Sequence, residues 1–263
     1  MSDIMLAEAG QRSQVAFQRR GARVAEVNLN LAEEVPVALV YNGISHVVLM
    51  ATPQHLRELA YGFSLTEGII RSVSDVYDLD IETSQQGVTV SMTLASACFA
   101  QLKQRRRQMS GRTGCGLCGI ESLAMAQPSV PQLRQPLDLI HYADDIQQAF
   151  KRLPILQPIN QATGACHAAA LLLPDQSLQV FEDVGRHNAL DKLIGWRMLQ
   201  PNQPIGPVLL TSRLSFELVQ KAAYAQLPLL AAISAPTALA VQLAQDAGMT
   251  LVAFVRDDRM TWF

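Results

Sequence analysis

Two cysteines lie three positions apart in the most glycine-rich part of the chain. Cys115 and Cys118 occur in the sequence GRTGCGLCGI at 111–120, whose glycine density predicts an irregular loop. Several cations lie near the pair: Lys103, Arg105, Arg106, Arg107 and Arg112. The thiolate is the nucleophilic form of cysteine, and nearby cations stabilise it. The pattern therefore favours a loop that presents a reactive thiolate or its persulfide, although the basic run alone would also suit a solvated helix face.

Three other interpretations of this cysteine pair remain open. A structural zinc site usually needs a second Cys or His pair, and the spacing gives no signal that Cys98, Cys166 or His167 completes one. A zinc-dependent deaminase site requires a base glutamate and then Pro-Cys-x-x-Cys, an order that this chain lacks. A thioredoxin-like redox pair follows a strand and opens a helix, whereas glycine flanks both thiols here. The sequence therefore predicts no metal ligands.

Polar residues collect where four predicted strands of the C-terminal half end. The polar stretches are EDVGRHN (182–188), TSRLS (211–215), SAPT (234–237) and RDDR (256–259). In open α/β sheets ligands bind beyond the carboxyl ends of the strands, and helix N-termini suit phosphate groups. Any one of these side chains can simply cap a helix or form a surface ion pair. Their convergence predicts a ligand cleft, with His187 as the better functional candidate among the histidines.

The C-terminal half alternates short apolar runs with helical patterns. The apolar runs are 168–173, 178–182, 207–211, 229–233 and 249–255, and the helical patterns are 143–153, 187–199, 215–226 and 237–247. This alternation is typical of an α/β fold. We expect a mixed, largely parallel sheet with helices on both faces.

The N-terminal half is predicted to be a smaller α+β unit. Asn42-Gly43 supplies the two positive-φ positions of a tight turn, which predicts a β-hairpin from 36–40 and 44–50. Thr52 is expected to cap a helix that continues to Gly68, and the alternation over 88–94 predicts a half-buried strand.

Three segments are expected along the chain. The first twenty residues show no sustained period and predict a mobile or loosely docked arm over 1–30, with order beginning near Glu34. The α+β unit with the cysteine loop covers 31–130, and prolines at 128, 131 and 136 mark a connector to the α/β domain at 131–263.

Composition restricts the classes of protein. Of 263 residues 49% are hydrophobic and 17% charged, which excludes a disordered chain, and a net charge of −2 provides no overall field for nucleic acid or an anionic membrane. The most apolar stretch, 227–244, is interrupted by prolines and polar residues, so no membrane span is expected. Four cysteines are too few for a disulfide scaffold, and acids precede any apolar run at the N-terminus. We expect a cytoplasmic protein with reduced thiols.

The sequence closely resembles the formate dehydrogenase accessory sulfurtransferase family, FdhD. The resemblance is carried by EVPVALVYNGISHVV (34–48), GFSLTEGII (62–70), GRTGCGLCGI (111–120), EDVGRHNALDK (182–192), FELVQK (216–221) and SAPTALAV (234–241). The glycine-flanked Cys-x-x-Cys and the downstream EDVGRH are highly specific in combination.

The resemblance implies a sulfur carrier. Such proteins take a persulfide from a cysteine desulfurase and pass its sulfur to the molybdenum or tungsten bis(guanine dinucleotide) cofactor of formate dehydrogenase. Cys115 would carry the persulfide, and Cys118 would assist or resolve the transfer. The cofactor-binding segment implied by the resemblance comprises Phe254, Val255, Arg256, Asp257, Asp258 and Arg259. Asp257 and Asp258 stand where the family has more neutral residues or glycine. Only their backbone groups are therefore expected to contact the cofactor.

The resemblance also implies a C-terminal domain like cytidine deaminase but without the zinc site, and a homodimer. Cys166 stands where relatives commonly have threonine, as a reactive extra thiol or a small buried substitute. Two alternative functions remain: a zinc- or nucleotide-binding module, and a maturation chaperone that transfers no sulfur.

Overall fold

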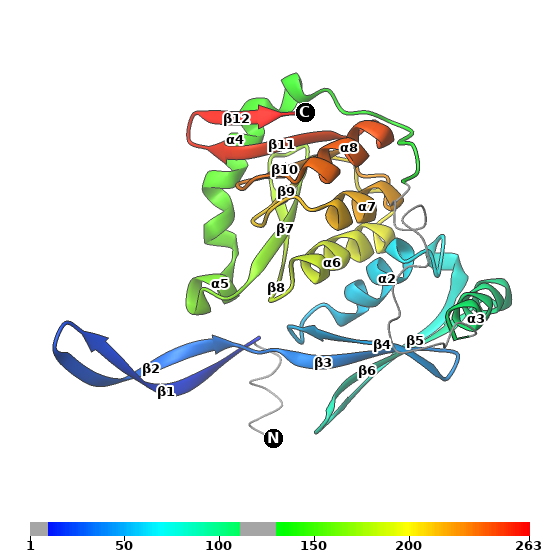
Figure 1. The fold of residues 1–263 in the computed structure, drawn as a ribbon, viewed down its shortest axis with the longest axis horizontal. Helices are drawn as coiled ribbons and strands as arrows, with labels where there is room; N and C mark the ends of the chain where they lie inside the picture. Colours follow the sequence, from blue (N-terminus) through cyan, green and yellow to red (C-terminus); the bar gives the residue numbers. More distant parts are fainter. Residues whose placement is uncertain (1–9, 111–129) are drawn as a thin grey trace.

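The structure, a computed structural model, describes residues 10–110 and 130–263. Within these ranges the chain forms a β-hairpin arm, a four-stranded sheet with two helices, and a six-stranded sheet flanked by helices (Figure 1). The side chains of 106–110, at the end of a helix, are not described. Cys115 and Cys118 lie outside the described residues.

The six-stranded sheet of the C-terminal half has the strand order β12-β11-β10-β9-β7-β8. Its strands are β7 (His167–Leu172), β8 (Leu178–Asp183), β9 (Val208–Leu210), β10 (Leu229–Ala232), β11 (Thr250–Arg256) and β12 (Arg259–Trp262). The sheet is mixed, as predicted, but the expectation that it is largely parallel was wrong. Only β9–β10 and β10–β11 are parallel. The short connections 173–177 and 257–258 make β7–β8 and β11–β12 antiparallel, and β7 is also antiparallel to β9.

Helices cover this sheet on both faces, which confirms the α/β prediction. On one face lie α6 (Arg186–Leu199), α7 (Phe216–Tyr224) and α8 (Ala238–Ala247), and on the other lies α4 (Ala143–Arg152), followed by the short α5 (Pro158–Thr163) (Figure 1). The alternation in β7 explains why both faces need cover. Ala169 and Leu171 pack into the core under α6 and α7, whereas Ala170 and Leu172 pack into the core under α4.

The N-terminal sheet contains the predicted hairpin. It runs in the order β4-β3-β6-β5, with β3 (Val35–Tyr41), β4 (Ile44–Ala51), β5 (Val76–Ser84) and β6 (Gly87–Leu94). Asn42 and Gly43 have φ values of 48° and 79°, as the turn requires. One face of this sheet packs against α2 (Leu56–Thr66) and α3 (Ser96–Ser110). Strand β5 was not predicted from the sequence.

The first helix starts later than its sequence suggests. Thr52 was predicted to cap it, but α2 begins at Leu56 after His55, whose φ is 57°. Thr52 is fully buried, and both its amide and its hydroxyl donate to Asp183 Oδ2 at 3.0 and 3.1 Å. A contact between units 131 residues apart therefore overrides the local capping preference.

The N-terminal arm is more regular than predicted. Strands β1 (Gln11–Arg20) and β2 (Arg23–Ala32) pair along their whole length as an antiparallel hairpin, so regular structure begins well before Glu34. The expectation that order begins near Glu34 was wrong. Apolar side chains fall on both faces of this two-stranded ribbon, so no single inward-facing pattern marks the strands in the sequence.

Two glycines set the distance between the N-terminal unit and the C-terminal domain. Gly62 of α2 and Gly195 of α6 lie where the two helices cross, and a Cβ on Gly62 would fall 1.8 Å from the carbonyl oxygen of Asp191. A Cβ on Gly195 would fall equally close to the carbonyl oxygen of Glu58. The two helix backbones are therefore in direct contact.

No helix in the described ranges is long and apolar enough to cross a membrane.

Candidate functional site

A buried ion pair at the end of β8 joins the two halves of the chain. Lys192 Nζ lies 2.7 Å from Asp183 Oδ2, and both side chains are fully buried. The ammonium also donates to the hydroxyl of Thr52 at 2.6 Å and to the carbonyl of Glu182 at 3.2 Å. Burial lowers the pKa of Lys192, and the charge of Asp183 opposes that shift. A buried charge with this many partners fixes the position of β4 against the C-terminal sheet.

The second oxygen of Asp183 completes this junction. It accepts hydrogen bonds from the amide of Gly185 at 2.8 Å and from the side chain of Asn188 at 3.0 Å. Asn188 also donates to the carbonyl of Met50 at 2.8 Å. Three side chains of the EDVGRHNALDK segment, those of Asp183, Asn188 and Lys192, therefore hold the fold together.

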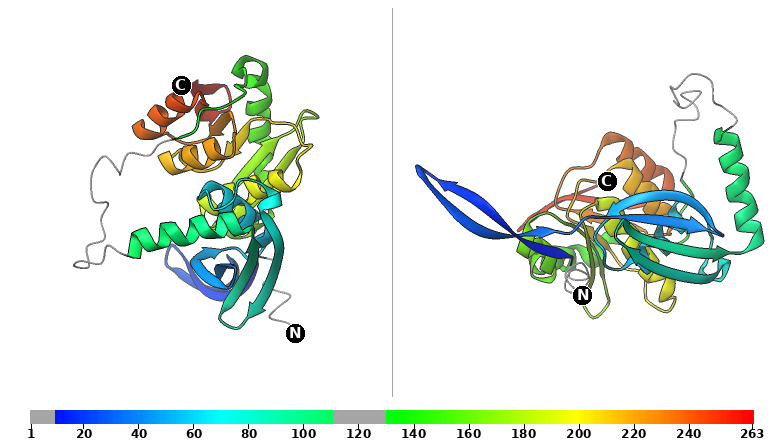
Figure 2. Two further views of the ribbon diagram at one scale, coloured as in Figure 1. Left: turned by 90° about the vertical axis from the view of Figure 1, so that its right-hand side faces the viewer. Right: turned by 90° about the horizontal axis from the view of Figure 1, so that it is seen from below.

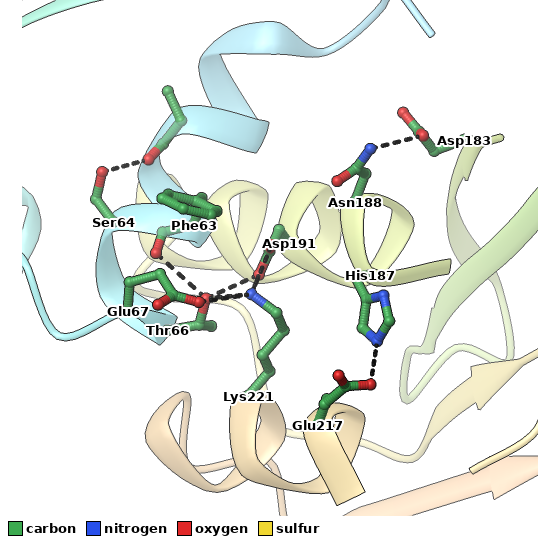
Figure 3. Close-up of polar contacts among 11 residues, drawn as sticks. Phe63, Ser64, Thr66, Glu67, Asp183, His187, Asn188, Asp191, Glu217 and Lys221 are labelled. Atoms are coloured by element: carbon green, nitrogen blue, oxygen red, sulfur yellow. Dashed lines mark hydrogen bonds and ion pairs between the residues drawn. The ribbon is translucent and has the colours of Figure 1, made fainter. Parts of the chain in front are cut away.

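A cavity of about 380 Å³ opens beside this junction, between α2, α6 and α7 (Figure 3). Its polar wall consists of Thr66, Glu67, Arg105, His187, Asn188, Asp191, Glu217, Gln220 and Lys221. Its apolar wall includes Phe63 and Tyr224. Both halves of the chain thus contribute to one site, with His187 in its wall as the sequence analysis proposed.

Lys221 and Asp191 form the most buried charged pair of the cavity wall. Lys221 Nζ lies 2.9 Å from Asp191 Oδ2 and 2.9 Å from the hydroxyl of Thr66, which itself donates to Asp191 Oδ1 (Figure 3). Glu67 lies 3.6 Å from the same ammonium. Burial raises the pKa of Asp191, and Lys221 opposes that shift. The network fixes Lys221 at the floor of the cavity.

His187 and Glu217 form a second pair, closer to solvent. His187 Nε2 lies 3.0 Å from Glu217 Oε2 (Figure 3), and Arg186 approaches the same oxygen at 3.9 Å. Burial lowers the pKa of His187, the charge of Arg186 lowers it further, and Glu217 opposes both. An imidazole with a lowered pKa is uncharged at neutral pH and can take up a proton at one ring nitrogen.

Arg105 connects this cavity with the cysteine motif along the chain. It lines the cavity from α3, and its Nη1 donates to the carbonyl of Glu67 at 3.0 Å. Helix α3 ends at Ser110, five positions before Cys115. The predicted roles of Cys115 and Cys118 concern residues beyond the described part of the chain.

The predicted cofactor segment lies around the turn from β11 to β12, on the opposite lateral side of the C-terminal sheet from β8. Arg256 and Arg259 face each other across this turn, and both are exposed, as are Asp257 and Asp258. Phe254 is 38% exposed and has a φ of 55°, beside a register shift in the strand pair. Val255 is buried and belongs to the core, so only its backbone can contact a ligand there. None of these six residues lines the cavity beside His187.

The four strand-end segments meet only in part. Leu214 pairs with Ala235 and Thr237, and the amide of Phe254 donates to the carbonyl of Ser234, so neighbouring loops are in contact as predicted. The cavity, however, uses residues of the first segment and of the helices that follow the first two segments, and its other walls come from the N-terminal half. Phe63, Thr66 and Glu67 were not predicted as site residues, although they lie in GFSLTEGII, one of the stretches that carry the family resemblance.

Cys166 is a poor nucleophile in this structure. It is buried, and its pKa rises to about 12 because burial and the carboxylates of Glu182 and Asp183 disfavour the thiolate. Of the two alternatives for this position, the buried substitute fits. Among residues 10–110 and 130–263, no cluster of three or more His, Cys, Asp or Glu side chains is arranged to hold a metal ion.

The sequence and the fold both match known proteins. The profile of the FdhD/NarQ family matches residues 32–263. The chain is 53% identical to "Sulfur carrier protein FdhD" of Cupriavidus necator, covering 92% of this chain and 84% of that protein. It is 49% identical to the protein of the same name from Acinetobacter baylyi, covering 93% and 90%.

A solved structure has the same fold. The "putative formate dehydrogenase accessory protein from Desulfotalea psychrophila" superposes with a TM-score of 0.72, covers 96% of both chains and is 24% identical. The family profile extends over both halves of the chain, including the helices that form the cavity. The chain belongs to the FdhD/NarQ family.

Proposed function

We propose that this protein is a sulfur carrier that serves the maturation of formate dehydrogenase. The observation that carries the proposal is the identity of 53% and 49% to proteins named "Sulfur carrier protein FdhD", over 84% and 90% of their lengths. The same chain contains the glycine-flanked pair Cys115 and Cys118, the residue type that sulfur carriage requires.

Cys115 is the proposed carrier. Its thiolate attacks the outer sulfur of a persulfide on a cysteine desulfurase, the S–S bond of that persulfide breaks, and the desulfurase cysteine leaves as a thiolate. Cys115 then holds the persulfide, and the exchange needs no added oxidant or reductant. Cys118 subsequently attacks the inner sulfur of this persulfide, forming a disulfide with Cys115 as sulfide passes to the acceptor.

The proposed acceptor is the molybdenum or tungsten bis(guanine dinucleotide) cofactor, as cargo rather than as a resident group. The paired and exposed Arg256 and Arg259 suit its pyrophosphates, because guanidinium groups bind phosphate through charge-assisted hydrogen bonds. The exposed ring of Phe254 offers an apolar surface nearby. Asp257 and Asp258 bring negative charge to the turn, so their side chains are not assigned to phosphate binding.

The cavity beside His187 is assigned to the handling of the sulfur. Cys115 follows Ser110, the last residue of α3, by five positions in the sequence, and Arg105 of the same helix lines the cavity. The uncharged imidazole of His187 can accept the proton of a thiol or persulfide, and Glu217 stabilises the resulting imidazolium at 3.0 Å. His187 is therefore the proposed proton acceptor for the carrier cysteine.

Complementation tests the proposal. In a bacterial strain that lacks its own carrier, wild-type protein restores formate dehydrogenase activity and Cys115→Ala does not. Cys166→Ala is the matched control, because it removes a thiol that is buried and predominantly protonated. Full activity with Cys115→Ala would instead support a maturation chaperone without sulfur transfer. Stoichiometric zinc that is lost with Cys115→Ala would support a metal-binding module.

A further inference from the structure

A second cavity, of about 270 Å³, lies beside α5 on the face of the six-stranded sheet that α4 covers, and we call it the α5 cavity. Buried and half-buried residues line it, among them Leu153, Gln157, Cys166, His167, Thr211 and Ile233. His167 begins β7, and Thr211 and Ile233 follow β9 and β10 directly. The α5 cavity therefore lies at the edge of the sheet where ligands of open α/β sheets bind.

Gln157 brings an unpaired hydrogen-bond donor to this cavity. The residue is 3% exposed, and its side-chain nitrogen Nε2 has no hydrogen-bond partner among the described residues. A buried donor without a partner destabilises the folded state, and native structures contain few of them. The position therefore favours a bound molecule that accepts a hydrogen bond.

The other polar groups of the α5 cavity are uncharged at neutral pH. Burial and the charge of Arg186 lower the pKa of His167. Burial and two nearby carboxylates raise the pKa of Cys166 to about 12. The hydroxyl oxygen of Thr211 accepts a hydrogen bond from the amide of Ala168 at 2.8 Å, which leaves the hydroxyl proton to donate. The cavity thus offers hydrogen-bond donors that carry no charge.

This lining disfavours charged ligands. None of the described residues that line the α5 cavity is Lys, Arg, Asp or Glu, so neither an anion nor a cation finds an ionic partner in the wall. An anion would also lie near Glu182 and Asp183, the carboxylates that disfavour the thiolate of Cys166. The rest of the wall is apolar and consists of Phe150, Leu153, Pro154 and Ile233.

We propose that the α5 cavity binds a small uncharged aromatic amide. The carbonyl oxygen of the amide accepts a hydrogen bond from Gln157 Nε2, and its ring contacts the apolar wall. Small-molecule sites typically have volumes of about 300–1,000 Å³, so a cavity of about 270 Å³ suits a molecule with a single ring.

The α5 cavity is separate from the proposed sulfur chemistry. No described residue lines both this cavity and the cavity beside His187. Helix α5 and helix α3, which precedes the cysteine motif, lie on opposite sides of the molecule (Figures 1 and 2). Failure of this inference would leave the carrier proposal unchanged.

Three probes of nearly equal size test the proposal. Benzamide is uncharged at pH 7.5, whereas benzoate is an anion and benzylamine a cation. Nuclear magnetic resonance titration of the ¹⁵N-labelled full chain is expected to show saturable binding of benzamide, at least tenfold tighter than that of either charged probe. Benzamide is also expected to shift the side-chain amide resonance of Gln157, which is identified by its absence from the spectrum of Gln157→Met.

Two variants locate the binding. Gln157→Met removes the donor but keeps the length of the side chain, and it is expected to weaken benzamide binding at least tenfold. Gln148→Met, at an exposed position of α4, is the matched control and is expected to bind as the wild type does. Ile233→Trp fills the cavity from a half-buried position and is expected to abolish binding. Circular dichroism establishes that each variant is folded.

Several results would overturn the proposal. These are the absence of saturable benzamide binding to the wild type, equal affinity for the three probes, and unchanged affinity in Gln157→Met. If Gln157→Met does not fold, Ile233→Trp decides, and benzamide affinity equal to that of the wild type would overturn the proposal.

Discussion

Gly62 and Gly195 pack backbone against backbone where α2 crosses α6, and this contact holds together the two helices that contribute Thr66 and Asp191 to the cavity wall. Any side chain at either position meets a main-chain carbonyl of the opposite helix at 1.8 Å. The close crossing brings Thr66 on α2 within 2.9 Å of Asp191 on α6. The site between the two halves of the chain therefore depends on two residues that have no side chain.

Gly195→Ala is expected to destabilise the protein by about 4 kcal/mol or to prevent folding, because the backbones must separate and the contacts between the two halves are lost. Gly164→Ala is the matched control. Gly164 has a φ of 68° and open space around it, so alanine there costs only about 1 kcal/mol of backbone strain. Urea unfolding of both variants checks the difference, and equal losses would show that the helix crossing tolerates a methyl group.

Lys192→Met is expected to cost about 3–5 kcal/mol, because it leaves the buried carboxylate of Asp183 without its cation. The double variant Asp183→Asn/Lys192→Met removes both charges and is expected to lose less than the sum of the two single variants. Lys151→Met, on the surface, is the control. Chemical denaturation of the wild type, Lys192→Met, Asp183→Asn and the double variant gives the four free energies of unfolding. Additive losses would mean that the two charges do not interact.

Stability is expected to fall as the pH falls below about 6.5, in part through His167. Burial and the charge of Arg186 lower its pKa in the folded protein. In the unfolded chain His167 has the ordinary histidine pKa of 6.5, so it binds a proton more readily there than in the folded protein. Protonation therefore favours unfolding. His167→Gln is expected to reduce the loss of stability between pH 7.5 and 5.5. The urea midpoint at each pH measures this, and identical pH dependence in wild type and His167→Gln would contradict it.

Arg256→Glu is expected to weaken the binding of a guanine nucleotide about tenfold or more, since one charge-assisted hydrogen bond contributes about 1.5–3 kcal/mol and the new carboxylate repels phosphate. Arg134→Glu makes the same charge change at another exposed position and is expected to bind as the wild type does. Isothermal titration calorimetry with GDP compares the three proteins. Unchanged affinity in Arg256→Glu would remove the turn between β11 and β12 from the nucleotide site.

Local sequence patterns predicted individual turns, strands and helices well. The contacts between the two halves of the chain and the strand directions depend on residues far apart in the sequence and were not predicted. Asn42-Gly43 specifies its turn by itself, so the hairpin was predicted correctly. The role of Thr52 depends on Asp183, which is 131 positions away, and no local pattern could reveal it. The same holds for the cavity: His187 was singled out from its polar neighbours, but Phe63 and Glu67 join it only through the crossing of α2 and α6. The direction of β7 follows from its short connection to β8, which apolar runs do not show.

The most direct test of sulfur carriage is intact-protein mass spectrometry after incubation with a cysteine desulfurase and cysteine. We expect wild-type protein and Cys118→Ala to gain the mass of one sulfur atom, about 32 Da, and to lose it on treatment with a reducing agent. Cys115→Ala is expected to gain nothing, and Cys166→Ala to behave as the wild type. A sulfur adduct that persists in Cys115→Ala, or no adduct on the wild type, would contradict the assignment of Cys115 as the carrier.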